Sequence, residues 1–195
     1  VRRAAGLLEG SLDGVDVVVA VSGELVRGLA EAGGILGDEV LRQVILRLEP
    51  TWSARGISWQ LDLNSVTVVS DEELLSHVWM NIIQNAIKFS PENAVIEVRV
   101  FATDTATVEI TDHGIGMDDA TVKRIFDRFY QADRSRKQEG VGLGLCLVKR
   151  ILDMLGGTVS VDSRPGEGST FRIHVPFRPK YDEAAHTGER EGKSP

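Results

Sequence analysis

Apolar and polar residues alternate along several short stretches of the chain, and this period of two residues predicts β-strands. The expected strands cover residues 57–63, 66–69, 94–101, 106–111, 158–162 and 170–175. Elsewhere apolar residues recur at intervals of three and four, which predicts helices with one buried face. The expected helices cover residues 38–48, with Asp38 as the cap, 71–89 and 145–155. A shorter helix is expected to begin after Asp118 and to run to Phe129.

This order of elements predicts an α+β fold in two layers: a mixed, mostly antiparallel sheet of about five strands, covered on one face by about three helices. We expect residues 38–177 to form this domain and Ser70 to open the helix 71–89 with a capping box. Residues 178–195 hold charges, glycine and proline with almost no apolar surface, and are expected to be a disordered tail. Residues 1–37 are interpreted as a connector, within which residues 15–21 fit either a strand or a helix.

The composition narrows the classes of function. The chain of 195 residues is 42% hydrophobic and 26% charged, as in an ordinary globular domain. Its net charge of −7 and its pI near 5.2 argue against a nucleic-acid partner and against direct contact with an anionic membrane. The single cysteine, Cys146, excludes an internal disulfide and a multi-cysteine metal site. No apolar run approaches the roughly 20 residues of a membrane-spanning helix, and no signal peptide is found, so we expect a cytoplasmic location even if the full-length protein carries a membrane anchor.

The helix expected over residues 71–89 carries a second, polar stripe. The stripe consists of His77, Asn81, Asn85 and Lys88, whose spacing keeps them on one helical face. A solvated polar face is the alternative interpretation, but such faces are usually rich in glutamate and lysine, whereas asparagine is a poor helix former. The repeated carboxamides therefore indicate that this face coordinates a ligand.

A carboxylate and a glycine-rich segment extend this pattern. Asp112 follows Val108 and Ile110 at the period of a strand, so it points to the buried face and needs a hydrogen-bond donor. The exocyclic amine of adenine is such a donor, and the amide oxygen of Asn85 is a hard ligand that suits Mg²⁺. The glycines between residues 140 and 144 precede a helix whose first N–H groups suit a phosphate. Together with a basic loop before these glycines, the pattern predicts a site for ATP and Mg²⁺ under a flexible lid.

Four segments in order carry a family resemblance. Asn81–Ser90, Asp112–Gly116, Phe126–Phe129 and Gly140–Leu145 are similar to the N, G1, F and G2 boxes. On these boxes, residues 38–177 resemble the catalytic ATP-binding domain of bacterial sensor histidine kinases. That family belongs to the superfamily with the Bergerat fold that it shares with gyrase, Hsp90 and MutL.

The resemblance implies a role for each matching position. Asn85 would bind Mg²⁺, Asn81 and Lys88 would contact the phosphates, and these three side chains would carry the catalysis. Asp112 would read the adenine amine, and Met117 would pack against the ring. Phe126 and Phe129 would anchor the lid and belong to the nucleotide site. The other implied nucleotide-binding positions are Phe89, Gly114, Gly116, Tyr130, Arg134, Val141, Gly142, Leu143, Gly144, Leu145 and Thr170.

Two departures from the family pattern matter. Gln131 stands where the lid often has an arginine, and Arg134 is the residue expected to take over its phosphate contact. The phosphoacceptor histidine, which the family places in a helix before this domain, is missing, since none of the four histidines has that context. The resemblance therefore implies a truncated kinase in which residues 25–37 fit the end of a dimerisation helix. Its partners would be ATP or ADP, a histidine-containing dimerisation domain and, downstream, a response regulator.

Several functions compete at this point. A protein-histidine kinase domain is favoured over an ATP hydrolase of the gyrase or Hsp90 kind, because those hydrolases carry a glutamate four residues before the Mg²⁺ ligand. Here that position is Asn81, which cannot accept a proton from water. A serine kinase of the anti-sigma type and a non-catalytic nucleotide-binding module remain alternatives.

Overall fold

The structure is a computed structural model that describes residues 6–12, 15–21, 34–131 and 142–177. Its centre is a five-stranded sheet in the order β4-β6-β7-β9-β8. The strands are β4 (Ser58–Leu63), β6 (Val95–Ala102), β7 (Ala106–Asp112), β9 (Gly168–Val175) and β8 (Thr158–Arg164). Only β4 and β6 run parallel, and the other three pairs are antiparallel. The predicted mixed, mostly antiparallel sheet is therefore confirmed.

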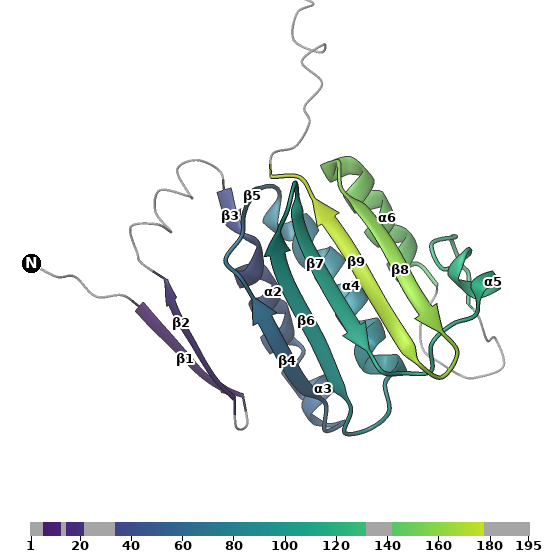
Figure 1. Ribbon diagram of the computed structural model, residues 1–195, viewed down its shortest axis with the longest axis horizontal. Helices are drawn as coiled ribbons and strands as arrows, with labels where there is room; N and C mark the ends of the chain where they lie inside the picture. Colours follow the sequence, from purple (N-terminus) through teal and green to yellow (C-terminus); the bar gives the residue numbers. More distant parts are fainter. Residues whose placement is uncertain (1–5, 13–14, 22–33, 132–141, 178–195) are drawn as a thin grey trace, which may run out of the picture.

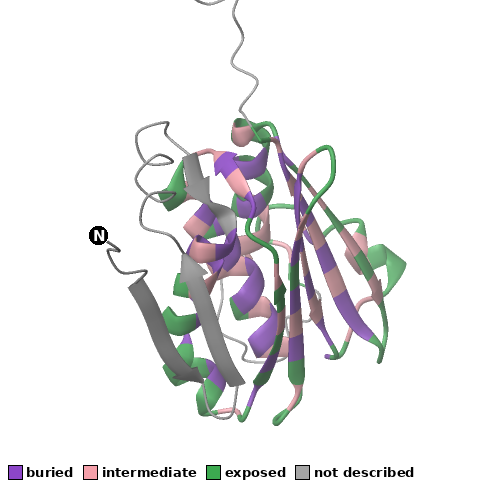
Figure 2. Ribbon diagram, turned by 60° about the vertical axis from the view of Figure 1, so that its left-hand side comes forward, coloured by how far each residue is buried: buried purple, intermediate pink, exposed green. Residues whose placement is uncertain are grey.

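Three longer helices lie on one face of this sheet (Figure 1). They are α2 (Gly37–Arg47), α4 (Glu72–Phe89) and α6 (Gly144–Leu155), with the short α3 (Glu49–Ser53) and α5 (Asp119–Val122) beside them. In a turned view coloured by burial, buried residues lie on the helices and strands where the two layers face each other (Figure 2). This arrangement is the predicted two-layer α+β fold. Among the helices that the structure describes, none combines the length and apolarity needed to cross a bilayer.

Two smaller sheets of two strands each accompany the central one. β1 (Gly6–Leu12) and β2 (Val15–Val21) pair as an antiparallel hairpin, so the strand interpretation of residues 15–21 was the correct one. β3 (Gly34–Leu36) pairs with β5 (Thr67–Val69), and this pairing makes the last residues before α2 a strand rather than the end of a helix. The remainder of the expected dimerisation-helix segment and the predicted tail lie outside the described residues.

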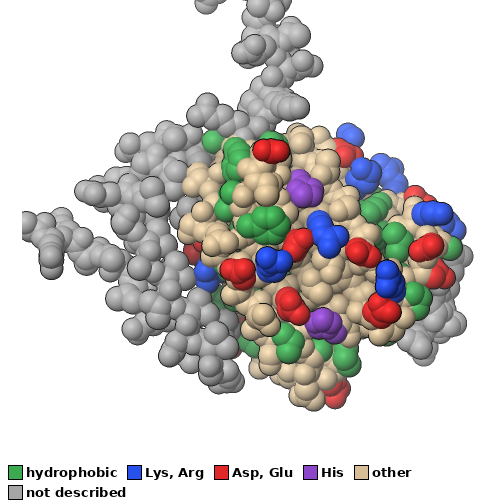
Figure 3. All heavy atoms as spheres, viewed as in Figure 1, with side chains coloured by type: hydrophobic (Ala, Val, Ile, Leu, Met, Phe, Trp, Pro, Cys, Tyr) green, Lys and Arg blue, Asp and Glu red, His purple; other side chains and the backbone are tan. Residues whose placement is uncertain are grey.

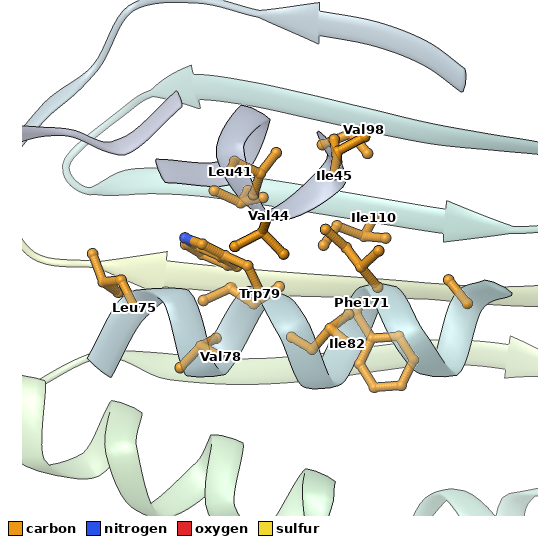
Figure 4. Close-up of a cluster of buried hydrophobic side chains, with 14 of the residues drawn as sticks. Leu41, Val44, Ile45, Leu75, Val78, Trp79, Ile82, Val98, Ile110 and Phe171 are labelled. Carbon is orange, nitrogen blue, oxygen red and sulfur yellow. The ribbon is translucent and has the colours of Figure 1, made fainter. Parts of the chain in front are cut away.

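The core lies between α4 and the inward side chains of the sheet (Figure 4). Ile110 of β7 and Ile173 of β9 are fully buried, and Phe171 of β9 is almost fully buried, as the period of two requires. The predicted core stripe of α4 is buried from Leu75 to Ala86, whereas its last member, Phe89, is only partly buried. The second face of α4 is therefore left for the polar stripe.

Three helix ends differ from expectation. The cap of α4 is Asp71, whose carboxylate accepts a hydrogen bond of 2.9 Å from Leu74 N, and the predicted capping box on Ser70 is wrong. Asp38 lies inside the first turn of α2 and is buried instead of capping it. Asp118 caps α5 as expected, through Thr121 N at 2.7 Å, but the helix ends at Val122 and turns follow it.

The face of the sheet away from the helices is polar, and a row of charges crosses it (Figure 3). Arg99 of β6 lies 3.7 Å from Asp62 of β4 and 3.4 Å from Glu109 of β7. Arg172 of β9 reaches the same Glu109 at 2.8 Å. These four side chains, which we call the outer charge row, give Asp62 and Glu109 at least one guanidinium partner each.

Candidate functional site

The polar stripe of α4 holds as predicted. Asn81, Asn85 and Lys88 are partly buried, whereas His77, one turn earlier, is exposed. The Asn81 amide nitrogen donates to the His77 carbonyl oxygen at 2.7 Å, which orients the Asn81 amide oxygen away from that carbonyl. The Lys88 ammonium lies 5.3 Å from the centre of the Phe89 ring, a cation–π distance.

Asp112 ends β7 on the helix-covered face and is only 5% exposed. Its carboxylate accepts hydrogen bonds from two backbone groups, Gly114 N at 2.9 Å and Ser169 N. Burial raises the pKa of Asp112 above its ordinary value, and the two backbone bonds together with the nearby His113 only partly oppose this. The protein itself therefore supplies two of the hydrogen-bond donors that a buried Asp112 carboxylate needs. A further donor from a ligand would stabilise the charged form of Asp112.

The loop after Asp112 is held against two other elements. Ile115 N donates to the Phe89 carbonyl oxygen at the end of α4 at 3.3 Å, and Met117 N donates to Ser163 Oγ of β8 at 2.9 Å. A Cβ atom on Gly114 would overlap the Phe89 carbonyl, which explains the glycine. The polar stripe and the G1 segment are thus brought together by the end of α4.

A hollow of about 350 Å³ opens where these elements meet. It is lined by Lys88, Phe89, Ser90, Pro91, His113, Gly114 and Ile115. His113 is exposed, as expected, and its Nε2 lies 3.0 Å from Glu97 Oε1 on the outer face. Three of the predicted nucleotide-binding residues, Lys88, Phe89 and Gly114, therefore share one concave surface.

The start of α6 approaches the other end of the polar stripe. A Cβ atom on Gly144 would lie 2.6 Å from the Asn81 amide oxygen, so only glycine permits this approach. The helix has no side-chain cap at its N-terminus, and its first N–H groups are therefore suited to an anion. Leu143, which precedes it, is exposed, whereas Leu145 packs partly against the core.

The end of the F segment is hydrogen-bonded to the described part of the G2 segment. Phe129 N donates to the Gly142 carbonyl oxygen at 3.0 Å, so the two ends that flank residues 132–141 lie together. Phe126 packs against the core, but Phe129 is 61% exposed. The Tyr130 ring lies under the Arg124 guanidinium, 4.5 Å from ring centre to Cζ. The predicted positions Arg134 and Val141 lie outside the described residues.

One predicted site residue is misplaced. Thr170 lies on the outer face of β9, where its hydroxyl is 3.0 Å from that of Thr111, so it does not lie beside Asp112. The preceding residue, Ser169, is buried on the inner face, bonds to Asp112 through its N–H, and places its hydroxyl 3.0 Å from that of Ser163. Sequence reasoning missed Ser169, although counting back by two from the core residue Phe171 identifies it.

The side chains of the site limit how Mg²⁺, the expected metal, could be held. No group of three or more His, Cys, Asp or Glu side chains that could hold a metal occurs in the described part of the chain. Mg²⁺ is commonly held through one or two protein ligands together with substrate phosphates and water. The Asn85 amide, one helical turn from the Asn81 side chain that Gly144 of α6 approaches, fits a metal that arrives with a nucleotide rather than a metal bound by the protein alone.

Comparison with known proteins identifies the family to which this chain belongs. A sequence profile of the family described as "Histidine kinase-, DNA gyrase B-, and HSP90-like ATPase" matches residues 70–179, more than half of the chain. The adaptive-response sensory kinase SasA of Prochlorococcus marinus is 35% identical over 142 residues, which cover 70% of this chain and 37% of SasA. The sensor-like histidine kinase SenX3 of Mycolicibacterium smegmatis is 37% identical over 127 residues, covering 64% and 33%. The chain thus spans about a third of the length of these relatives.

Solved structures give the same assignment. The mycobacterial sensor histidine kinase MprB superposes with a TM-score of 0.68 at 28% identity, covering 75% of this chain and 99% of that one. Full-length ShkA in complex with AMPPNP superposes with a TM-score of 0.64 at 29% identity, covering 71% and 29%. The match therefore extends over nearly the whole of the solved MprB chain.

Proposed function

The chain belongs to the family of histidine kinase-, DNA gyrase B- and HSP90-like ATPases as an ATP-binding catalytic domain of the sensor histidine kinase type, and from this premise we propose its reaction. It transfers the γ-phosphoryl group of ATP to a histidine on a helical dimerisation domain that is not part of this sequence. The single observation that carries the proposal is the position of Asn81, Asn85 and Lys88 along one face of α4, together with the approach of Gly144, the first residue of α6, to Asn81.

Adenine recognition is assigned to Asp112. Its carboxylate is buried, and its donors among the described residues are the backbone N–H groups of Gly114 and Ser169. Burial raises the pKa of Asp112, so a ligand amine adds the donor that stabilises its charge. Nearby, Met117 packs partly against the core, and the Phe89 carbonyl oxygen accepts a hydrogen bond from Ile115 N, three residues after Asp112. The AMPPNP complex of the related ShkA supports an adenine nucleotide as the ligand class.

The phosphates are assigned to the polar stripe of α4 and the start of α6. Lys88 offers a positive charge, and the first N–H groups of α6 offer donors that no side chain caps. Asn85 would hold Mg²⁺ through its amide oxygen, with Asn81 beside it. When bound, the metal would neutralise phosphate charge and orient the γ-phosphoryl group.

Transfer is favoured over hydrolysis by Asn81. A carboxylate at this position could activate water, whereas the Asn81 amide has no proton-accepting strength and already donates to the His77 carbonyl. In the proposed step a nitrogen of the acceptor imidazole forms a bond to the γ-phosphorus while the bond to the bridging oxygen of ADP breaks. The residues of this chain position the donor and balance its charge.

The test is transfer from γ-labelled ATP to a helical dimerisation domain of a relative, added in trans. We expect acid-labile label on that domain, no label on this chain alone, and loss of transfer in Asn85→Ala. Gln84→Ala is the matched control, since Gln84 is an exposed carboxamide on the same helix, and transfer should persist in it.

Three outcomes would contradict the proposal. Acid-labile label on this chain alone would identify one of its own histidines as an acceptor. Acid-stable label on a serine of a partner would favour the serine kinase alternative. Rapid release of inorganic phosphate without an acceptor domain would show a hydrolase.

A further inference from the structure

The last turn of α4 carries Lys88 and Phe89, and the carbonyl groups of this turn are all satisfied. A helix normally leaves its final four carbonyl oxygens without intrahelical donors. Here Ala86 O accepts from Ser90 N at 3.1 Å, and Phe89 O accepts from Ile115 N at 3.3 Å. The two carbonyl oxygens between them, of Ile87 and Lys88, accept from a residue more than 30 positions away.

That residue is Arg55, which lies between α3 and β4. Its Nη1 donates to Ile87 O at 2.6 Å and to Lys88 O at 3.0 Å, and its Nη2 donates to Ser90 O at 2.7 Å. A guanidinium presents its donors in a fixed planar fork, so three carbonyl groups can be held in one geometry. Hydrogen bonds with a charged donor are also stronger than neutral ones. The Arg55 side chain therefore acts as the C-terminal cap of α4.

The position of Arg55 is itself built into the fold. Asn93 N donates to Arg55 O at 2.9 Å, and Arg55 N donates to Trp52 O at 3.2 Å. The next residue, Gly56, has φ +64, and a Cβ atom there would overlap the Asn93 side chain. Trp52 is buried and anchors α3 to α2 through its Nε1, which donates to Ile45 O at 2.9 Å. The backbone that carries the guanidinium is thus fixed from both sides.

We propose that Arg55 is a positioning residue for the phosphates of ATP, acting through Lys88. The proposal rests on the proposed function, in which Lys88 contacts phosphate. The C-terminal carbonyl groups of a helix attract cations, and a lysine in the last turn can hydrogen-bond them. With Arg55 on these oxygens, the last turn is held in place and the Lys88 ammonium is directed to the phosphates rather than to its own helix end.

Removing the guanidinium has two consequences for Lys88. The carbonyl oxygens of Ile87, Lys88 and Ser90 lose a shared donor, so the last turn of α4, which carries Lys88, loosens. The Lys88 ammonium then becomes the cation within the same turn that can replace the lost donor. Both effects weaken phosphate binding while leaving every residue that faces the nucleotide unchanged.

A double-mutant cycle on nucleotide affinity tests the proposal. ATP binding is measured by calorimetry for the wild type, Arg55→Met, Lys88→Met and the double variant. We expect Arg55→Met to weaken ATP binding about tenfold, the loss of one charge-assisted contact. In the Lys88→Met background the same substitution should change affinity by less than about twofold, because the contact through which it acts is already gone.

Two further variants separate positioning from stability. Arg55→Lys keeps the positive charge but cannot reach three carbonyl groups in one plane, so it should restore only part of the affinity. Arg99→Met is the matched control, since it removes an arginine from the outer charge row and should leave ATP affinity unchanged. Because Arg55→Met is also expected to lower the melting temperature, binding is compared well below the transition of each variant.

A second measurement follows Lys88 directly. The lysine ammonium groups are observed by nuclear magnetic resonance in wild type and in Arg55→Met at saturating ATP. We expect the Lys88 signal to shift with ATP in the wild type and to shift less in the variant. Equal shifts in both proteins, or equal losses of affinity in both backgrounds of the cycle, would overturn the proposal. A wild type that does not bind ATP would instead overturn the proposed function.

Discussion

On the outer face of the sheet, Glu109 of β7 lies between Arg99 and Arg172. Asp112, three residues later on the same strand, lies on the inner face. The hydrogen-bond donors that the structure describes there are two backbone N–H groups. Both carboxylates are shielded from water, since the Glu109 side chain is 18% exposed and Asp112 is 5% exposed. Burial raises the pKa of Asp112 above its ordinary value. The partners, rather than the burial, therefore separate the two residues.

The difference shows how a structural charge can be told from a binding charge. Two guanidinium groups satisfy Glu109 within the sheet, so a ligand has little to add there. Two N–H groups leave Asp112 short of compensation for its desolvation, which makes it a place where a ligand donor is stabilising. Substitutions on the inner face should therefore change ATP affinity, whereas those on the outer face should not.

The largest effect is expected from Asp112→Asn. Replacing the carboxylate by an amide removes a charge-assisted hydrogen bond to the adenine amine, which should weaken ATP binding by roughly 1.5–3 kcal/mol, about ten- to a hundredfold. Glu109→Gln makes the same chemical change on the outer face and should leave the affinity unaltered. Calorimetry on both variants decides the point, and equal affinities in wild type and Asp112→Asn would remove Asp112 from the site.

A smaller effect is expected from the neighbouring pair Ser169 and Thr170. Ser169→Ala removes the hydroxyl that bonds Ser163, the acceptor of Met117 N, so it should cost about 1 kcal/mol of stability and weaken ATP binding severalfold. Thr170→Val removes the bond to Thr111 on the outer face and should lower stability without changing affinity. Urea unfolding and calorimetry are the measurements. A loss of affinity in Thr170→Val instead would reverse the assignment of the two faces.

The pH dependence should separate stability from binding. The pKa of Asp112 is raised above its ordinary value of 3.8 in the folded state, so the folded protein takes up this proton more readily than the unfolded chain. The contribution of Asp112 to stability therefore increases as the pH falls through the raised pKa, and decreases as the pH rises. ATP affinity should change in the opposite direction, because the protonated form no longer offers a charged acceptor.

Other groups titrate as well, so the contribution of Asp112 is taken as the difference between the wild type and Asp112→Asn. Urea unfolding and calorimetry across the acidic range give the two curves. Wild-type stability that falls relative to the variant as the pH falls would contradict the assignment.

The smallest effect is expected in the outer charge row. Arg172→Met removes one of the two guanidinium partners of Glu109, and partly exposed ion pairs contribute only about 0.2–1 kcal/mol. The loss should shrink as salt is added, because the side chains remain accessible to screening. Thermal unfolding at low and high salt measures it. A loss of several kcal/mol would show that this row is as important to the fold as the core beneath it.

Much of the site could be predicted from local sequence patterns. The steps of four, four and three placed the stripe from His77 to Lys88 on one face of α4, and the period of two placed Asp112 on the buried side of β7. Both inferences use only the geometry of one element. Thr170 was assigned to the site from the family motif, without applying the strand period of two. Phe171 is a core residue, so this period places Ser169 on the inner face and Thr170 on the outer face.

The sequence by itself determined which side chains share a face, because the helical and strand periods are local properties of the backbone. Only the tertiary structure decided what those faces meet. The cap that Arg55 places on α4, the second donor that Ser169 gives to Asp112, and the approach of Gly144 to Asn81 each join residues more than 30 positions apart. Such contacts follow from the strand order and the packing of helices on the sheet, and no periodicity along the chain encodes them.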